Sequence, residues 1–336
     1  MIDKTVLSKY DKSGMYKVYD MWPEISRNAY NANYESVNFT NVDNIVFSGM
    51  GGSGAIGDIF AAILSKSNIH VSVVKGYNLP STVNKNSLVV TTSVSGDTIE
   101  TLSVLENAKK IGCNLIGFSS GGKMEKYCKN NNIEFRKIKE IHSPRASFPN
   151  FLYAILKILK PIIPIEEENI IDSINALEIT KKKISSENLN SKNTALSLAK
   201  NMNGIPLIYY PFGLQASAIR FKNCLQENSK IHAIVEDVVE ACHNGIVSWE
   251  KDSIVQPILI EGTDDFLKTK ERWEIIKDYF NINEIKYQEI FSVDGNILSK
   301  LINLIYVLDY SSIFHAVISQ IDPSPVKSID FVKSKL

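Results

Sequence analysis

The stretch that decides the fold reads Asn44-Ile45-Val46-Phe47-Ser48-Gly49-Met50-Gly51-Gly52-Ser53-Gly54. It begins as an apolar run that predicts a buried strand and continues as a glycine turn leading into a predicted helix at 54–65. Glycines let the backbone approach a ligand closely, and a helix N-terminus offers N–H groups that lack intrahelical partners. The stretch therefore predicts an anion pocket, and a phosphate is the usual occupant of such a pocket.

Two other classes of nucleotide-binding protein have similar glycine motifs, and the flanking residues argue against both. The dinucleotide-binding pattern requires an acidic residue after the next strand to hold a ribose, but the predicted strand 70–74 ends in Lys75-Gly76. A nucleotide-triphosphate loop requires Lys followed by Ser or Thr, where this chain has Ala55-Ile56. A nicotinamide dehydrogenase and a P-loop enzyme are both disfavoured.

A second polar loop follows another apolar run. The predicted strand 87–92 leads into Ser93-Val94-Ser95-Gly96-Asp97-Thr98, and a helix is predicted at 98–110. Three hydroxyls around a glycine at a helix N-terminus suit a small phosphate, although an ordinary helix cap is the alternative. Two such loops on strands of one parallel sheet would meet at its carboxyl edge, where these sheets bind ligands.

Composition limits the class of protein. The 336 residues include 37 Lys+Arg and 37 Asp+Glu, so the formal net charge is zero and no nucleic-acid surface is expected. Hydrophobic residues make up 44% of the chain, enough for well-packed cores. The four cysteines lack C-x-x-C spacing, so we expect neither disulfides nor a metal site, and no cofactor. Because charges or prolines interrupt the longest apolar segments, we expect a cytoplasmic protein without a membrane span.

Strands and helices alternate along the chain, which predicts an α/β protein of two doubly wound domains, each a mainly parallel sheet flanked by helices. The expected organisation is an N-terminal helical segment at 1–38, a first domain at 39–160, a connector with a charged surface helix at 161–195, and a second domain at 196–336. Further strands are predicted at 44–48, 114–118, 133–137, 205–210, 255–260 and 285–291. Further helices are predicted at 122–130, 146–160, 214–228, 237–249, 264–281 and 295–320.

Three residues outside the two loops could take part in proton chemistry. Glu227 lies near the end of a predicted helix, His243 has polar and turn-forming neighbours, and Arg145 follows a proline. Taken singly, a solvated carboxylate, a structural histidine and a surface arginine are the simpler interpretations. The residues alone leave both possibilities open.

The motifs together resemble a known family. The two loops, extended to Glu100-Thr101, and Ser143-Pro144-Arg145-Ala146 resemble the sugar isomerase (SIS) domain. Further elements are similar to the archaeal-type bifunctional phosphoglucose/phosphomannose isomerases, which have two SIS domains: Asn223-x-x-x-Glu227-Asn228-x-Lys230, His243-Asn244, and Asp322-Pro323-Ser324-Pro325-Val326 with Lys333. In this order the elements span nearly the whole chain.

The resemblance implies flavodoxin-like domains and a metal-independent aldose–ketose isomerase. Its substrates would be glucose 6-phosphate and fructose 6-phosphate, and also mannose 6-phosphate, with proton transfer through an enediolate. The phosphate would be bound by Gly51, Gly52, Ser53, Ser93, Ser95 and Thr98. Such chemistry needs a base near neutral pKa, a cation beside the developing oxyanion, and an acid or base for the ring oxygen.

The family also implies a role for each remaining residue. Glu227 would carry the proton between C2 and C1, and Arg145 would stabilise the enediolate. His243 and Lys333 would assist ring opening, with His243 supplied by the partner subunit of a homodimer. The chain departs from the family at Asp97, where the phosphate loop is expected to have Asn; an outward-turned carboxylate could cap a helix instead.

Two other functions remain as alternatives. A catalytically silent SIS module that senses a sugar phosphate would keep both loops but would not need Glu227, His243 or Lys333. The lack of a basic DNA-binding region argues against it. An amino-sugar synthase would carry an amidotransferase domain with an N-terminal nucleophile, which we do not expect in a chain that starts Met1-Ile2-Asp3.

Overall fold

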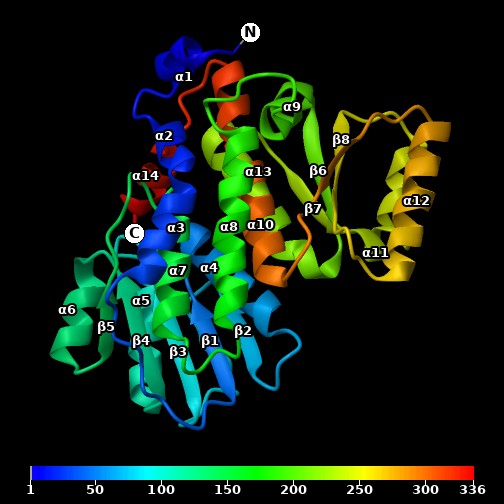
Figure 1. Ribbon diagram of the computed structural model, residues 1–336. Helices are drawn as coiled ribbons and strands as arrows, with labels where there is room; N and C mark the ends of the chain where they lie inside the picture. Colours follow the sequence, from blue (N-terminus) through cyan, green and yellow to red (C-terminus); the bar gives the residue numbers. More distant parts are fainter. Residues whose placement is uncertain (1) are drawn as a thin grey trace. The chain divides into compact units, whose positions relative to one another are not determined.

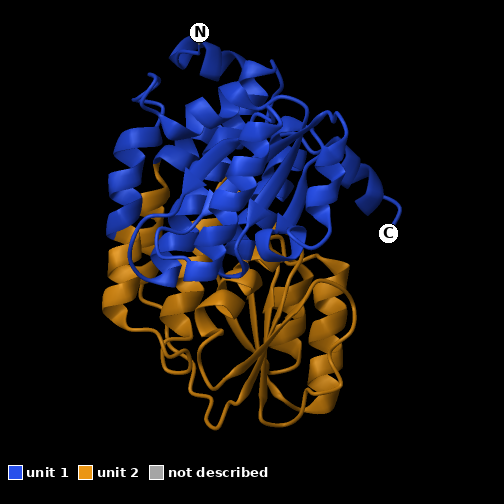
Figure 2. Cartoon of the chain, turned by 90° about the vertical axis from the view of Figure 1, so that its right-hand side faces the viewer, with its two compact units in different colours: residues 1–20, 175–336 blue, residues 21–174 orange. Residues whose placement is uncertain are grey.

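The computed structural model describes residues 2–336, whose elements are labelled in Figure 1. It divides into two compact units, coloured separately in Figure 2. Unit 2 contains Met21–Ile174, and unit 1 contains Met1–Asp20 and Asn175–Leu336. The division falls inside the helix α8 (Glu167–Ile184). The compact units thus include the segments 1–38 and 161–195, which the sequence places outside the two sheet domains. The predicted domain boundaries stay a prediction.

Unit 2 is built on a parallel sheet of five strands in the order β2-β1-β3-β4-β5. The strands are β1 (Asn44–Ser48), β2 (His70–Val74), β3 (Ser87–Thr92), β4 (Asn114–Ser119) and β5 (Glu134–Lys137). Every residue of β1 and β3 is buried, as expected of central strands in a parallel sheet covered on both faces. All five predicted strands are confirmed to within one residue.

Helices cover both faces of this sheet. The helices that lie wholly within unit 2 are α3 (Trp22–Asn31), α4 (Gly51–Leu64), α5 (Ile99–Ile111), α6 (Gly122–Asn130) and α7 (Phe148–Ile158). Phe47 of β1 stacks on Phe60 of α4, with ring centroids 4.7 Å apart. The preceding residue, Val46, points to the opposite face and packs in a core cluster with Leu105 of α5 and Met124 of α6. The doubly wound arrangement predicted for this part of the chain is confirmed.

Unit 1 is built on a parallel sheet of four strands in the order β7-β6-β8-β9. The strands are β6 (Ile205–Tyr210), β7 (Ile234–Asp237), β8 (Val255–Glu261) and β9 (Gln288–Phe291). The edge strand β7 is not among the strands predicted from the sequence. The sequence also predicts one helix at 237–249, where the structure has the short helix α11 (Val238–Ala241), a turn and the 3-10 helix η3 (Gly245–Glu250).

The helices of unit 1 also differ from the prediction in detail. They are α1 (Lys4–Tyr10), α2 (Met15–Asp20), α9 (Thr194–Asn201), α10 (Gln215–Cys224), α12 (Leu267–Ile282), α13 (Ile297–Ile318) and α14 (Lys327–Lys333). The single helix predicted at 214–228 is a 3-10 turn η1 (Phe212–Leu214), then α10, then the π-helical turn η2 (Leu225–Ser229). The π turn lies in the segment that contains Glu227.

The helix α13 is the apolar centre of unit 1. Among the described residues it alone is long and apolar enough to cross a membrane, yet 83% of the apolar window is buried inside the structure. It packs against α9, α10 and η2. Burial of this kind is what a core helix of a folded unit shows.

Candidate active site

The glycine turn after β1 forms the start of α4. The helix begins at Gly51, three residues before the predicted start, so the N–H groups of Gly51 and Gly52 lie in its first turn, where intrahelical acceptors are lacking. The Ser53 side chain is buried at 7% exposure. A Cβ added at Gly54 would lie 2.8 Å from the carbonyl oxygen of Gly49, so the glycines here are needed for close backbone packing.

The second loop gathers its hydroxyl groups at the end of β3. The Ser93 and Thr98 hydroxyls are hydrogen-bonded to each other at 2.9 Å, and the Gly96 N–H donates to the Ser93 hydroxyl at 3.0 Å. The Asp97 N–H donates to the Ser95 hydroxyl at 3.3 Å. The helix α5 starts directly after Thr98. The loop therefore combines three side-chain hydroxyls with the N–H groups of a helix N-terminus.

These two loops flank the point where the sheet reverses its winding. From β1 the chain crosses to β2 on one side and then to β3 on the other, and β1 and β3 pair with each other, with Ser48 opposite Thr91. Ligands of such sheets bind at the carboxyl ends of the strands beside this switch point. The predicted phosphate residues, from Gly51 to Ser53 and from Ser93 to Thr98, therefore occupy neighbouring strand ends of one sheet.

Asp97 is turned toward the next helix rather than left unpartnered. Its Oδ1 accepts a hydrogen bond from the N–H of Lys123, in the first turn of α6, at 2.9 Å. The turn before α6 is packed against the loop, because the Ser120 N–H donates to the Val94 carbonyl at 2.9 Å. The carboxylate thus satisfies an N–H that the first turn of a helix leaves without an intrahelical acceptor.

Replacing Gly96 by alanine is expected to destabilise unit 2. Gly96 has φ +78°, and an added Cβ would lie 1.9 Å from the carbonyl oxygen of Gly121. The left-handed backbone alone costs an L-residue roughly 1–2 kcal/mol, and relieving the clash adds to that cost. Thermal unfolding of the full chain should show a lower midpoint for Gly96→Ala. Gly76→Ala is the matched control, because a Cβ there meets no atom within 4 Å; equal midpoints for the two variants would contradict the packing argument.

Arg145 is buried in the turn before α7. Its exposure is 5%, so it is not the surface arginine that residue type alone suggests. The Ser147 hydroxyl holds this turn by sharing its one hydrogen between the carbonyls of Ile141 and Ser143, at 3.0 and 2.9 Å. The Trp22 indole N–H donates to the carbonyl of Ala146, the residue after Arg145, at 3.2 Å. These hydrogen bonds hold the main chain on both sides of Arg145, the residue that carries the guanidinium.

Glu227 lies half-buried in the π-helical turn η2 of unit 1. Insertions of this kind in α-helices are frequent at functional sites. The two residues that follow anchor the turn to α13: the Asn228 amide donates to the Ser312 hydroxyl, and the Ser229 hydroxyl donates to the Ser312 carbonyl, both at 2.8 Å. Ser312 therefore holds the turn that carries Glu227, a role that no motif in the sequence predicts.

A buried ion pair supports the same region. Arg220 of α10 contacts Asp309 of α13 through Nε at 3.0 Å and Nη2 at 2.7 Å, and their side chains are 2% and 0% exposed. The Tyr19 hydroxyl donates to the same carboxylate oxygen at 3.2 Å. Burial alone would lower the pKa of Arg220, but the carboxylate of Asp309 keeps that pKa above its usual value. Arg220 is thus a charged structural residue.

His243 and Glu227 lie at opposite ends of β7. Glu227 comes before the strand in the sequence. The short helix α11 follows the strand directly, and His243, which is exposed to solvent, comes after α11. The four residues of β7, which lie between Glu227 and His243 in the sequence, span roughly 10 Å. Lys333 ends α14, a helix with no buried residue. The structure thus places these three predicted residues on separate segments of unit 1.

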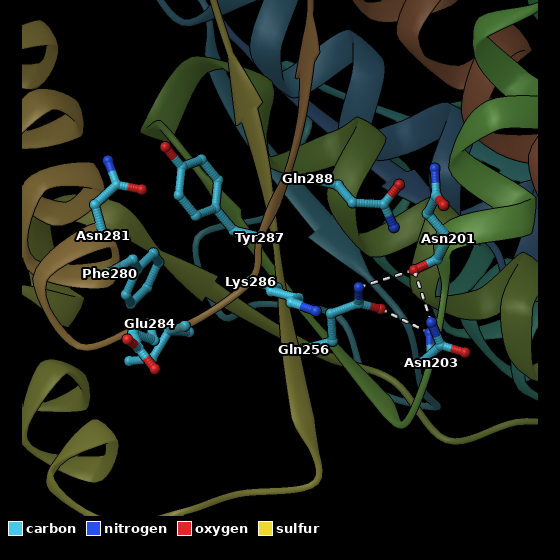
Figure 3. A pocket seen from close by; sticks show the side chains of 10 residues that line it. Asn201, Asn203, Gln256, Phe280, Asn281, Glu284, Lys286, Tyr287 and Gln288 are labelled. Atoms are coloured by element: carbon cyan, nitrogen blue, oxygen red, sulfur yellow. Dashed lines mark hydrogen bonds between the residues drawn. The ribbon is translucent and has the colours of Figure 1, made fainter.

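A cavity of about 830 Å³ in unit 1 is lined by none of these residues (Figure 3). It is at the amino ends of β8 and β9, opposite the strand ends where such sheets bind ligands. The amide of Gln256 is already used, donating to the Asn201 carbonyl at 2.8 Å and accepting from the Asn203 N–H at 2.7 Å. The cavity is not part of the candidate site.

Comparison with known proteins gives the family. Residues 191–336 match the family described as the bacterial phospho-glucose isomerase C-terminal SIS domain, and residues 38–157 match the SIS domain. A bifunctional phosphoglucose/phosphomannose isomerase of Caldicellulosiruptor bescii is 30% identical over 329 residues, which is 95% of each chain. The chain belongs to the bifunctional phosphoglucose/phosphomannose isomerase family. The family resemblance predicted from the sequence is confirmed.

Other relatives agree with this assignment. A protein of the same family from Aquifex aeolicus is 28% identical over 96% of both chains. Among solved structures, a hypothetical protein of Thermus thermophilus superposes with a TM-score of 0.74, covering 98% of this chain and 92% of that one at 15% identity. The C-terminal domain of a glucosamine-fructose-6-phosphate aminotransferase from Francisella tularensis gives 0.66, at 18% identity over 91% and 96%. The structural likeness supports the SIS fold of both units.

Proposed function

We propose that this chain interconverts glucose 6-phosphate and fructose 6-phosphate, and mannose 6-phosphate and fructose 6-phosphate. The observation that carries the proposal is the match to a bifunctional isomerase over 95% of both chains. The silent sugar-phosphate sensor receives no support from these relatives, whose names are those of isomerases. The location of the protein in the cytoplasm stays a prediction.

The phosphate group is assigned to the two loops of unit 2. N–H groups of Gly51 and Gly52 and the side chain of Ser53 are at the N-terminus of α4, and the hydroxyl-rich loop 93–98 precedes α5. Two helix N-termini favour a dianion through their dipoles. No group of three or more His, Cys, Asp or Glu side chains suited to a metal ion is found among residues 2–336. Metal independence of the reaction is therefore a prediction for the assay below.

Proton transfer is assigned to Glu227 of unit 1. In the forward direction its carboxylate would take the proton from C2 of the open-chain aldose and return it to C1, while the hydroxyl proton passes from O2 to O1, which yields the ketose. The guanidinium of Arg145 in unit 2 would stabilise the enediolate oxygen, since a preorganised cation acts most strongly where negative charge develops. The anchoring of the Glu227 turn by Ser312 supports a group whose position matters.

Ring opening is assigned to His243 and Lys333, with a homodimer as the active form. Because β7 separates His243 from Glu227 within one chain, a histidine that works beside Glu227 is more easily supplied by a partner subunit. The proposal requires that the protein is a dimer in solution. Dilution below the dimer dissociation constant should then reduce specific activity.

The test is a coupled assay of the purified, chelator-treated protein with fructose 6-phosphate, following glucose 6-phosphate and mannose 6-phosphate separately. Formation of both products supports the bifunctional reaction and its independence of metal. Glucose 6-phosphate alone would restrict the function to phosphoglucose isomerisation. Binding of fructose 6-phosphate without either product would favour the sensor and remove the roles given to Glu227 and His243.

A further inference from the structure

Lys230 closes the π-helical turn of Glu227 and has no part in the chemistry assigned above. Its backbone is left-handed, with φ +59°, and its N–H donates to the carbonyl of Leu225. This conformation is uncommon for a residue other than glycine, asparagine or aspartate.

The Lys230 side chain joins this turn to the C-terminal part of the chain. Its Nζ donates to the carbonyl of Glu227, to that of Pro325 at 2.8 Å and to that of Pro323 at 3.4 Å. An ammonium group has three N–H donors, so the three carbonyls can use all of them. Because every one of these acceptors belongs to the main chain, the contact depends on where the two backbones lie.

The segment held by Lys230 leads directly to Lys333. Pro323 and Pro325 have no N–H, so their carbonyls are the backbone groups by which they can be held. Ser324 bonds within its own turn, donating its N–H to Asp322 Oδ1 at 3.0 Å, and its hydroxyl contacts that of Ser13. The helix α14 follows, buries none of its residues and ends at Lys333. Lys230 therefore connects the segment that precedes this helix to the turn of Glu227.

We propose that Lys230 is a positioning residue that fixes the C-terminal segment Asp322–Leu336 against the Glu227 turn. The inference rests on the proposed function, which gives Glu227 its role in proton transfer and Lys333 its role in ring opening. Lys230 acts through these two residues and through the three carbonyls. Its loss should change turnover more than substrate binding, because the predicted phosphate loops belong to unit 2.

Lys230→Met tests the proposal, since methionine keeps an unbranched stem and removes all three donors. We expect kcat to fall about 10- to 100-fold, as for a displaced catalytic group, with KM within about threefold. Limited trypsin digestion should cleave after Lys327 faster than in the unchanged protein. Lys230→Arg keeps N–H donors and should restore most of both properties. Lys200→Met, which changes an exposed lysine at the end of α9, is the matched control.

A double-mutant cycle separates positioning from a local structural role. If Lys230 acts on Lys333, the kcat loss of Lys230→Met combined with Lys333→Met should be smaller than the product of the two single losses. Unchanged kcat and cleavage rate in Lys230→Met would overturn the inference, as would multiplicative losses with unchanged cleavage. If the unchanged protein shows no isomerase activity, the proposed function fails instead, and the cleavage rates still test the contact.

Discussion

Exchanging Glu227 for glutamine is expected to lower kcat for isomerisation of fructose 6-phosphate by about 100- to 10,000-fold, the usual contribution of a general base. The carboxamide has nearly the same size and keeps its place in the turn, but it cannot take a proton from carbon. The Kd for fructose 6-phosphate should stay within about threefold, because the phosphate is assigned to the loops of unit 2. Steady-state kinetics and isothermal titration calorimetry measure the two effects separately.

Glu271→Gln is the matched control for this change. Glu271 is an exposed carboxylate of α12 that forms an ion pair with Lys268, one helical turn away. It should keep the kcat of the unchanged protein. If Glu227→Gln turned over at a rate close to that of the control, Glu227 would have no place in the mechanism. If it lost binding along with turnover, its role would lie in holding the substrate.

The fold of unit 2 could be predicted from the sequence because its signals are local. A buried apolar strand followed at once by glycines, as at 44–54, has one common structural solution, and each later strand is bounded by turn residues. The start of α4 was placed three residues late, since glycines at 51 and 52 are poor helix formers. They are tolerated in the helix because they form its first turn.

Unit 1 was harder to predict because its departures depend on distant residues. The strand β7 is short, two of its four residues are acidic, and it runs directly into Val238, so the pattern resembles a helix. As an edge strand it is also partly exposed, so it lacks the continuous apolar run of a central strand. The π turn of Glu227 could not be foreseen, since its anchor, Ser312, lies 84 residues from Asn228.

Some of the candidate site residues could likewise be predicted from local sequence, and others depend on distant contacts. Motifs identified the loop residues, and the structure places them at adjacent strand ends, whereas only the structure shows that Arg145 is buried, in a turn that Ser147 closes. Lys230 belongs to the motif that contains Glu227, but only its contacts with Pro323 and Pro325 indicate a function. A motif shows which residues matter, and the tertiary contacts are needed to show how they act.

Replacing Asp309 by alanine is expected to give the largest loss of stability in unit 1. The change leaves the guanidinium of Arg220, which is 2% exposed, without its carboxylate, and it removes the acceptor of the Tyr19 hydroxyl. Removing one partner of a buried ion pair costs about 3–5 kcal/mol. For a unit of this size the midpoint of thermal unfolding should fall by roughly 10 °C, measured by calorimetry on the full chain.

The double variant Arg220→Met with Asp309→Leu decides what causes this loss. A buried pair replaced by apolar residues of similar volume is often neutral or even stabilising, because both desolvation penalties disappear together. If the unpaired charge is the cause, the double variant should recover most of the midpoint, apart from about 1 kcal/mol for the Tyr19 hydrogen bond. A double variant as unstable as Asp309→Ala would mean that the ion pair is needed for the packing of α10 on α13. In that case the turn of Glu227, which Ser312 of α13 anchors, should lose its position too, and kcat should fall with stability.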